Sequence, residues 1–166
     1  MSAITSRFDL IDAHITRWMA RYGLRLLRTS LGVVFLWFGA LKFFPGMSPA
    51  SDLAARTIDV LSFGIVPANV SVPLLAGWEC LIGVGLLFGI FMRATLLLLA
   101  VQMAGTLTPL VLFPSEVFTH IPYAPTLEGQ YIIKNAVLIS AAIVLGATVR
   151  GGGLVAEKAR VPVQRS

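Results

Sequence analysis

The polar residues of this chain that could do chemistry stand inside apolar stretches. The clearest case is the segment Glu128-Gly-Gln-Tyr-Ile-Ile-Lys-Asn135, which opens an apolar run that continues to Ala147. A charged side chain inside a hydrophobic span costs about 3 kcal/mol or more unless it is paired or solvated. Such residues predict either a buried polar network or a ligand-binding site within lipid. The candidate residues are Lys42, Glu79, Gln102, Glu128, Tyr131, Lys134 and Asn135.

The composition indicates a protein that lies in a membrane. Hydrophobic residues make up 57% of the chain and charged residues 13%, and the mean hydropathy is +0.84. Soluble domains have about 25% charged residues. The 166 residues give one domain with room for about four spans of about 20 residues each. The net charge of +5 is then a topology signal, and no interleaving of basic and aromatic residues suggests a nucleic-acid surface.

The elements that must position the candidate residues are helices. We predict an all-α fold, an integral membrane four-helix bundle with spans at about 26–44, 72–91, 94–113 and 128–149. Residues 1–25 are predicted to form a cytoplasmic amphipathic helix on the membrane surface, because apolar residues recur there at helical spacing. A short helix is predicted in the outer loop at 52–63, as a lid or a connector. A second loop is predicted at 114–126, and residues 150–166 are predicted to form a basic cytoplasmic tail.

Charge asymmetry orients these spans. Ten of the thirteen lysines and arginines lie on the side that holds both termini and the Arg93 turn. The positive-inside rule places that side in the cytoplasm. Lys42, Glu79, Glu128 and Lys134 then share the outer half of the bundle, with two acids balancing two bases. We favour pairing of Glu79 with Lys134, and of Glu128 with Lys42 or the loop, although the sequence leaves the pairing open.

The chain lacks a self-contained set of groups for catalysis or electron transfer. Its single cysteine, Cys80, excludes an internal disulfide and CxxC redox chemistry, and we interpret it as a small packing residue. His14 and His120 fall on opposite predicted sides of the membrane, which excludes a bis-histidine haem within one chain. No metal site is predicted. Whether the protein is an enzyme stays open, and it would be at most a membrane subunit of an oxidoreductase.

Three parts of the chain resemble the DoxX-like superfamily of small bacterial four-helix membrane proteins. They are Leu31-Gly-Val-Val-Phe-Leu-Trp-Phe-Gly-Ala-Leu-Lys-Phe-Phe-Pro45, the helix carrying Glu79, and the segment 128–135. The likeness covers about residues 24–150 and is greatest to the branch that contains the inner-membrane protein of reactive-chlorine resistance. The resemblance implies a multi-pass protein of the bacterial plasma membrane. Some members are subunits of quinone-reducing thiosulfate oxidoreductases and others are tied to oxidative-stress defence, but the resemblance implies no catalytic residues.

Three functions fit these patterns. The first is a redox-associated or oxidative-stress subunit that binds a quinone-like lipophilic molecule at the polar cluster. It has no intrinsic cofactor, and it relies on a peripheral redox partner or a homo-oligomer. The second is a structural or stress-response scaffold without small-molecule chemistry, and the third is a small transporter or proton-conducting element. A ligand-sized space between Lys42, Glu79 and Lys134 would favour binding, whereas direct contact between the side chains would favour a structural network.

Overall fold

The computed structural model describes residues 3–152, with side chains from Ile11 onward, and it confirms the all-α membrane fold. Four helical segments are long and apolar enough to cross a membrane: Ile11–Leu41, Ala68–Phe88, Met92–Leu112 and Leu127–Thr148. A bilayer core of about 30 Å needs about 20 helical residues. The protein is therefore a multi-pass membrane protein. Most of the predicted tail at 150–166 lies outside the described residues.

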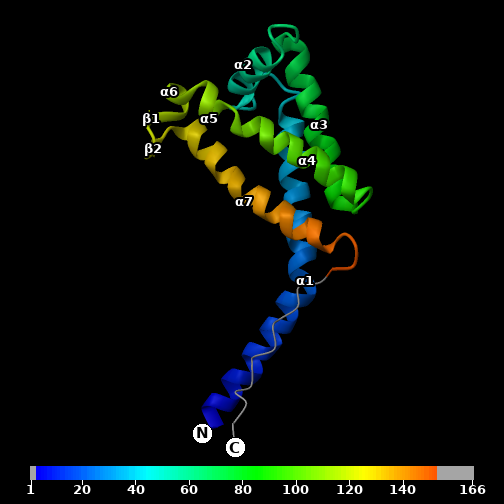
Figure 1. Cartoon of the computed structure of the whole chain (residues 1–166). Helices are drawn as coiled ribbons and strands as arrows, with labels where there is room; N and C mark the ends of the chain where they lie inside the picture. Colours follow the sequence, from blue (N-terminus) through cyan, green and yellow to red (C-terminus); the bar gives the residue numbers. More distant parts are fainter. Residues whose placement is uncertain (1–2, 153–166) are drawn as a thin grey trace, which may run out of the picture.

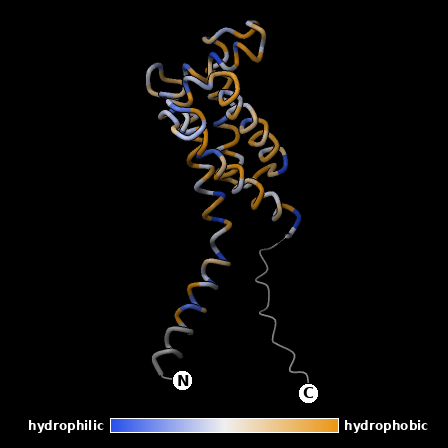
Figure 2. Tube along the Cα trace, turned by 60° about the vertical axis from the view of Figure 1, so that its left-hand side comes forward, coloured by the Kyte–Doolittle hydropathy of each residue, from blue (hydrophilic) through white to orange (hydrophobic). Residues whose placement is uncertain are grey.

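The first helix, α1 (Ala3–Leu41), is one continuous helix of 39 residues. The expected division between a surface helix at 1–25 and a separate first span is therefore absent, because the chain has no proline before Pro45 and Gly23 alone does not break the helix. At 1.5 Å per residue α1 is about 58 Å long, well beyond the thickness of a bilayer core. Its N-terminal part projects beyond the other helices and alternates between apolar and polar residues (Figures 1 and 2).

The second spanning helix, α3 (Ala68–Phe88), packs along α1. Glycines allow the close approach. A Cβ atom added to Gly83 would lie 2.5 Å from the backbone nitrogen of Leu36, and one added to Gly39 would lie 2.8 Å from Cβ of Glu79. The helix ends at Gly89, whose φ of +68° is the left-handed conformation that favours glycine. The predicted tight hairpin follows, because α4 (Met92–Leu107) begins three residues later.

The remaining helices complete the bundle and its cap. The third span continues from α4 through a break into α5 (Pro109–Leu112), and the fourth is α7 (Leu127–Thr148), which packs against α4. The predicted outer-loop helix is α2 (Ser51–Leu61), and it lies beside the start of α3 (Figure 1). The second predicted loop, at 114–126, holds α6 (Pro114–Val117) and an antiparallel pair of short strands, β1 (Phe118–His120) and β2 (Ala124–Pro125).

Two apolar clusters hold these elements together. The larger one lies inside the bundle and joins α1, α3, α4 and α7; its buried members include Phe35, Ile82, Leu86, Leu99 and Leu145. The smaller one joins the cap, formed by α2, α6 and the two short strands, to α7 through Leu53, Val117 and Ile132. Burial of each such side chain contributes about 1.5–3 kcal/mol in water, but within lipid the main gain is close packing. The cap is thus a packed part of the fold.

Candidate functional site

A buried polar triad lies inside the bundle and is built from three helices. The ammonium group of Lys42 donates to Oε2 of Glu79 over 2.6 Å, and Nε2 of Gln102 donates to Oε1 of the same carboxylate over 3.0 Å. The Lys42 ammonium also lies 3.4 Å from the carbonyl oxygen of Phe38. The side chains of the ion pair are only 8% and 10% exposed. One carboxylate therefore connects α3 to the end of α1 and to α4.

The sequence explains why Lys42 reaches this position. Gly32, Phe35, Gly39 and Lys42 are spaced three or four residues apart, so they share one face of α1. That face packs on α3, where Gly39 leaves room for the Glu79 side chain. Lys42 therefore faces inward, toward Glu79. The pairing neutralises both charges, which is the condition under which a buried ion pair is tolerated.

The triad lies deeper than expected. The sequence places Glu79 about seven residues from the outer end of its span. The helix begins at Ala68, so Glu79 is eleven residues, about 16 Å, from that end and nine residues, about 13 Å, from Phe88. The ion pair is therefore close to the middle of α3. The difference arises because Pro67 ends the loop and α3 begins directly after it, four residues before the predicted start.

The charged residues of α7 are not part of this triad. The ammonium group of Lys134 lies 5.5 Å from the centre of the Tyr131 ring, and both residues are exposed. Glu128 is also exposed. It lies in the first turn of α7, where the helix dipole stabilises a negative charge. The expected pairing of Glu79 with Lys134 is therefore wrong. The helix packs on the bundle through Gly129, Ile132, Ala141 and Leu145, so Lys134 and Tyr131 lie on another side of it.

Asn135, the last of the seven predicted residues, forms a separate contact. Its Nδ2 donates to Oγ1 of Thr106 over 3.2 Å and so connects α7 to α4. Thr106 in turn donates to the carbonyl oxygen of Met103 over 2.9 Å. Of the seven predicted residues, the structure thus brings Lys42, Glu79 and Gln102 together. Asn135 lies in a second polar contact, and Glu128, Tyr131 and Lys134 lie on the exposed surface of α7.

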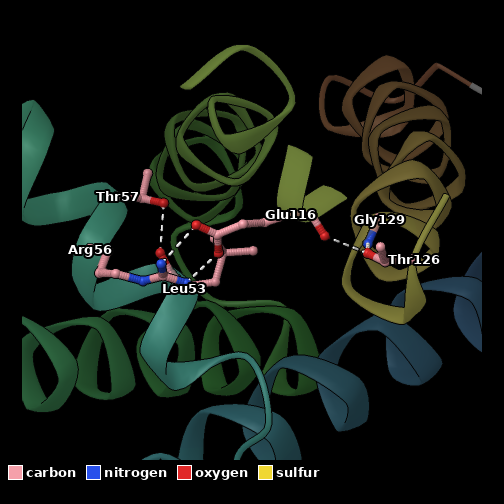
Figure 3. Close-up of polar contacts among 6 residues, drawn as sticks. All are labelled: Leu53, Arg56, Thr57, Glu116, Thr126 and Gly129. Carbon is pink, nitrogen blue, oxygen red and sulfur yellow. Dashed lines mark hydrogen bonds and ion pairs between the residues drawn. The ribbon is translucent and has the colours of Figure 1, made fainter. Parts of the chain in front are cut away.

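The cap holds a polar network that the sequence did not predict (Figure 3). Arg56 of α2 donates two hydrogen bonds to the carboxylate of Glu116 of α6, and the one from Nη1 to Oε1 measures 2.7 Å. This hydrogen bond raises the pKa of Arg56, whose guanidinium also lies 5.6 Å from the centre of the Phe113 ring. The only signal available in the sequence was opposite charge on two loops of the same predicted side.

The same network continues into the start of α7. Oγ1 of Thr126 donates to the carbonyl oxygen of Glu116 over 2.7 Å. Oγ1 of Thr126 also accepts a hydrogen bond from the backbone nitrogen of Gly129 over 3.2 Å. Thr126 is therefore the N-cap of α7, since it satisfies one of the free N–H groups of the first turn. The result is a chain of polar contacts from α2 through α6 to α7 (Figure 3).

The structure has a groove, but it does not lie at the polar triad. A groove of about 400 Å³ runs along α1 beside Leu87 of α3 and is lined only by apolar side chains; these include Val33, Trp37, Ala40 and Phe44. None of the seven candidate residues lines it. No group of three or more His, Cys, Asp or Glu residues within 3–152 could hold a metal ion. The arrangement at Glu79 can hold helices together, and both oxygens of its carboxylate already have protein partners.

Comparison with known proteins identifies the family. The DoxX family matches residues 23–114, which is more than half of the 166 residues. That stretch contains the whole triad of Lys42, Glu79 and Gln102 and the cap residue Arg56. No curated protein and no solved structure matches the chain. The match, together with the four apolar helices, shows that this chain belongs to the DoxX family of integral membrane proteins.

Proposed function

We propose that this protein is a structural scaffold in the bacterial plasma membrane. Its buried triad of Lys42, Glu79 and Gln102 fixes the register of three helices. The observation that carries the proposal is the direct contact of both Glu79 oxygens with protein donors, Lys42 and Gln102. A carboxylate that served a guest molecule would need an open side facing a cavity. Here Gly39 packs directly against the Glu79 side chain, and no residue of the triad lines the apolar groove along α1.

The surroundings of the triad argue against a transport pathway. On the side toward the α3–α4 turn, Ile82, Leu86 and Leu99 are completely or almost completely buried and pack into one apolar cluster. A proton or ion that reached Glu79 from the outer side would next meet this cluster. Charged species need a polar or water-filled path through a membrane. The apolar packing therefore supports a scaffold over a transporter or proton-conducting element.

A second candidate function, a redox-associated or oxidative-stress subunit that binds a quinone-like molecule, rests on the surface of α7. Lys134 and Tyr131 are exposed on a membrane-spanning helix and offer hydrogen-bond donors to a ligand that diffuses in the bilayer. The buried triad supports such a ligand less well, because both oxygens of the Glu79 carboxylate are already bound to Lys42 and Gln102. In this candidate a peripheral redox partner supplies the electrons, and α7 contributes binding and orientation.

Purification with native lipids separates the two candidates. The full-length protein would be extracted in a mild detergent, and co-purified lipophilic molecules would be identified by mass spectrometry. The scaffold predicts no quinone above the amount carried by an unrelated membrane protein of similar size. The second candidate predicts a quinone that is retained by the wild type and lost from Lys134→Met. Tyr123→Phe is the matched control, since Tyr123 is an exposed residue outside α7.

We further propose that both termini face the cytoplasm. The support is the concentration of arginines at the end of the bundle that holds the α3–α4 turn and the N-terminal part of α1, including Arg17, Arg21, Arg25 and Arg93. Fusion of alkaline phosphatase or a fluorescent protein to the C-terminus tests this orientation. Fluorescence without phosphatase activity is expected, and phosphatase activity from a C-terminal fusion would contradict it.

A further inference from the structure

The arginine-rich end of α1 carries a basic surface that no part of the described chain neutralises. Arg21, Arg25 and Arg28 follow one another at intervals of four and three residues, so they share one face of the helix. The same face continues into the bundle as Gly32, Phe35 and Gly39, which pack against α3. Within the bundle this face has a partner helix. Beyond the end of α3 the face consists of arginines.

Arg28 lies on this face of α1 beside Gly89, at the end of α3. Its Nε atom is buried and has no hydrogen-bond partner among residues 3–152, and it is the only buried side-chain nitrogen or oxygen of that range in this state. Its guanidinium lies over Gly89, in the space that a Cβ atom at that position would fill. Gly89 therefore does two things: it adopts the left-handed turn that ends α3, and it leaves room for the arginine.

The surroundings place Arg28 at the membrane boundary. The turn beside it joins the ends of two spanning helices, Ala68–Phe88 and Met92–Leu112. Large apolar side chains of the turn are exposed, with Phe88 at 72% and Phe91 at 85%. Apolar side chains of this kind favour the acyl region, whereas the guanidinium favours the layer of lipid phosphates directly above it. This arrangement is the one expected of an arginine at the level of the lipid phosphates.

The charges near this position have one sign. Arg93 lies in the first turn of α4, four residues after Gly89, and it is exposed. Going toward the N-terminus, the first acid that α1 offers is Asp12, sixteen residues from Arg28 and so about 24 Å away along the helix. Going the other way, the first is Asp52, in the cap at the opposite end of the bundle. No protein carboxylate of the described chain forms an ion pair with this surface.

We propose that Arg28, together with Arg25 and Arg93, binds the phosphate group of an anionic phospholipid at the junction of α1 and the α3–α4 turn. A guanidinium is planar and presents paired donors that match two phosphate oxygens. The neighbouring arginines supply more positive charge than a zwitterionic lipid needs, which favours a lipid with net negative charge. The acyl chains of this lipid lie against the exposed apolar residues of the turn.

Native mass spectrometry of the detergent-solubilised full-length protein tests the proposal. Phosphatidylglycerol and phosphatidylcholine of the same acyl chains would be titrated separately, and the dissociation constant of the first bound lipid would be measured for each. Arg28→Gln is expected to weaken phosphatidylglycerol binding about fivefold or more and to leave phosphatidylcholine binding unchanged. Arg17→Gln is the control, because Arg17 is exposed on α1 and hydrogen-bonds to His14 instead.

Three results would overturn the proposal. They are equal binding of the two lipids by the wild type, equal weakening by Arg17→Gln and Arg28→Gln, and full retention of phosphatidylglycerol by Arg28→Gln. If Arg28→Gln does not fold, Arg28→Lys replaces it, since lysine keeps the charge but loses the planar pair of donors. Phosphatidylglycerol should then still bind better than phosphatidylcholine, but more weakly than in the wild type. Unchanged affinity for phosphatidylglycerol in Arg28→Lys would contradict a role for the guanidinium geometry.

Discussion

Removal of the positive charge from the buried triad should destabilise the protein strongly. Lys42→Met leaves the buried Glu79 side chain, which is 10% exposed in the wild type, with Gln102 as its remaining partner. Loss of one member of a buried ion pair costs about 3–5 kcal/mol, because the other charge stays desolvated. Glu79→Gln alone should also destabilise, since it leaves the ammonium unpaired. The double variant Lys42→Met, Glu79→Gln should be less destabilised than the sum of the two single variants, because a neutral amide can still bond to Gln102.

Equilibrium unfolding of the full-length protein in mixed micelles measures these effects as a double-mutant cycle. We expect a coupling free energy of about 2 kcal/mol between Lys42 and Glu79, near the upper end of the range for residues in one network. The exposed pair Arg56 and Glu116 is the matched control, and its coupling should be clearly smaller because solvent screens it. A Lys42–Glu79 coupling below about 0.5 kcal/mol would refute the view that this pair fixes the helices.

Three other predictions concern packing, a second polar contact and the cap. Gly83→Ala should destabilise the protein by about 1–3 kcal/mol, since the added methyl group meets the backbone of α1. Gly105→Ala should stabilise it by about 0.5–1 kcal/mol, because the space beside Gly105 is open. Thermal unfolding in detergent compares the two variants. Asn135→Ala should cost about 0.6 kcal/mol, the average for a hydrogen bond between membrane helices, in the same assay. Arg56→Met should increase hydrogen exchange in α2 while leaving exchange in α3 unchanged, because its contacts with Glu116 lie in the cap; equal increases in both helices would contradict this.

Much of the fold could be predicted from the sequence because lipid imposes a simple rule. A spanning segment must satisfy its own backbone groups, so each long apolar run has to be a helix. The glycine face of α1 was also readable, since Gly32, Gly39 and Lys42 recur at a spacing that places them on one side. That pattern favours a Lys42 side chain that faces inward. The continuous α1 was missed because amphipathic and spanning segments differ in composition, while helix geometry permits both in one helix.

The pairing of charges could not be predicted, because it depends on tertiary placement. The sequence favoured Lys134 over Lys42 as the partner of Glu79. In the structure α7 packs through Ile132 and turns Lys134 outward, so Lys42 is the partner instead. Arg56 and Glu116 are separated by 60 residues. Their contact depends on α2 and α6 folding back onto the same cap, which no local pattern of either segment encodes.

The central claim is that the Glu79 carboxylate is fully engaged by protein donors and serves no ligand. Infrared difference spectroscopy tests it most directly: a short-chain ubiquinone analogue is added to the reconstituted full-length protein, and the carboxylate bands that disappear in Glu79→Gln are followed. We expect these bands to stay unchanged when the quinone is added, because Lys42 and Gln102 occupy both oxygens. A quinone-dependent shift of the Glu79 bands that is abolished by Lys42→Met would contradict the scaffold account and assign the triad to ligand binding.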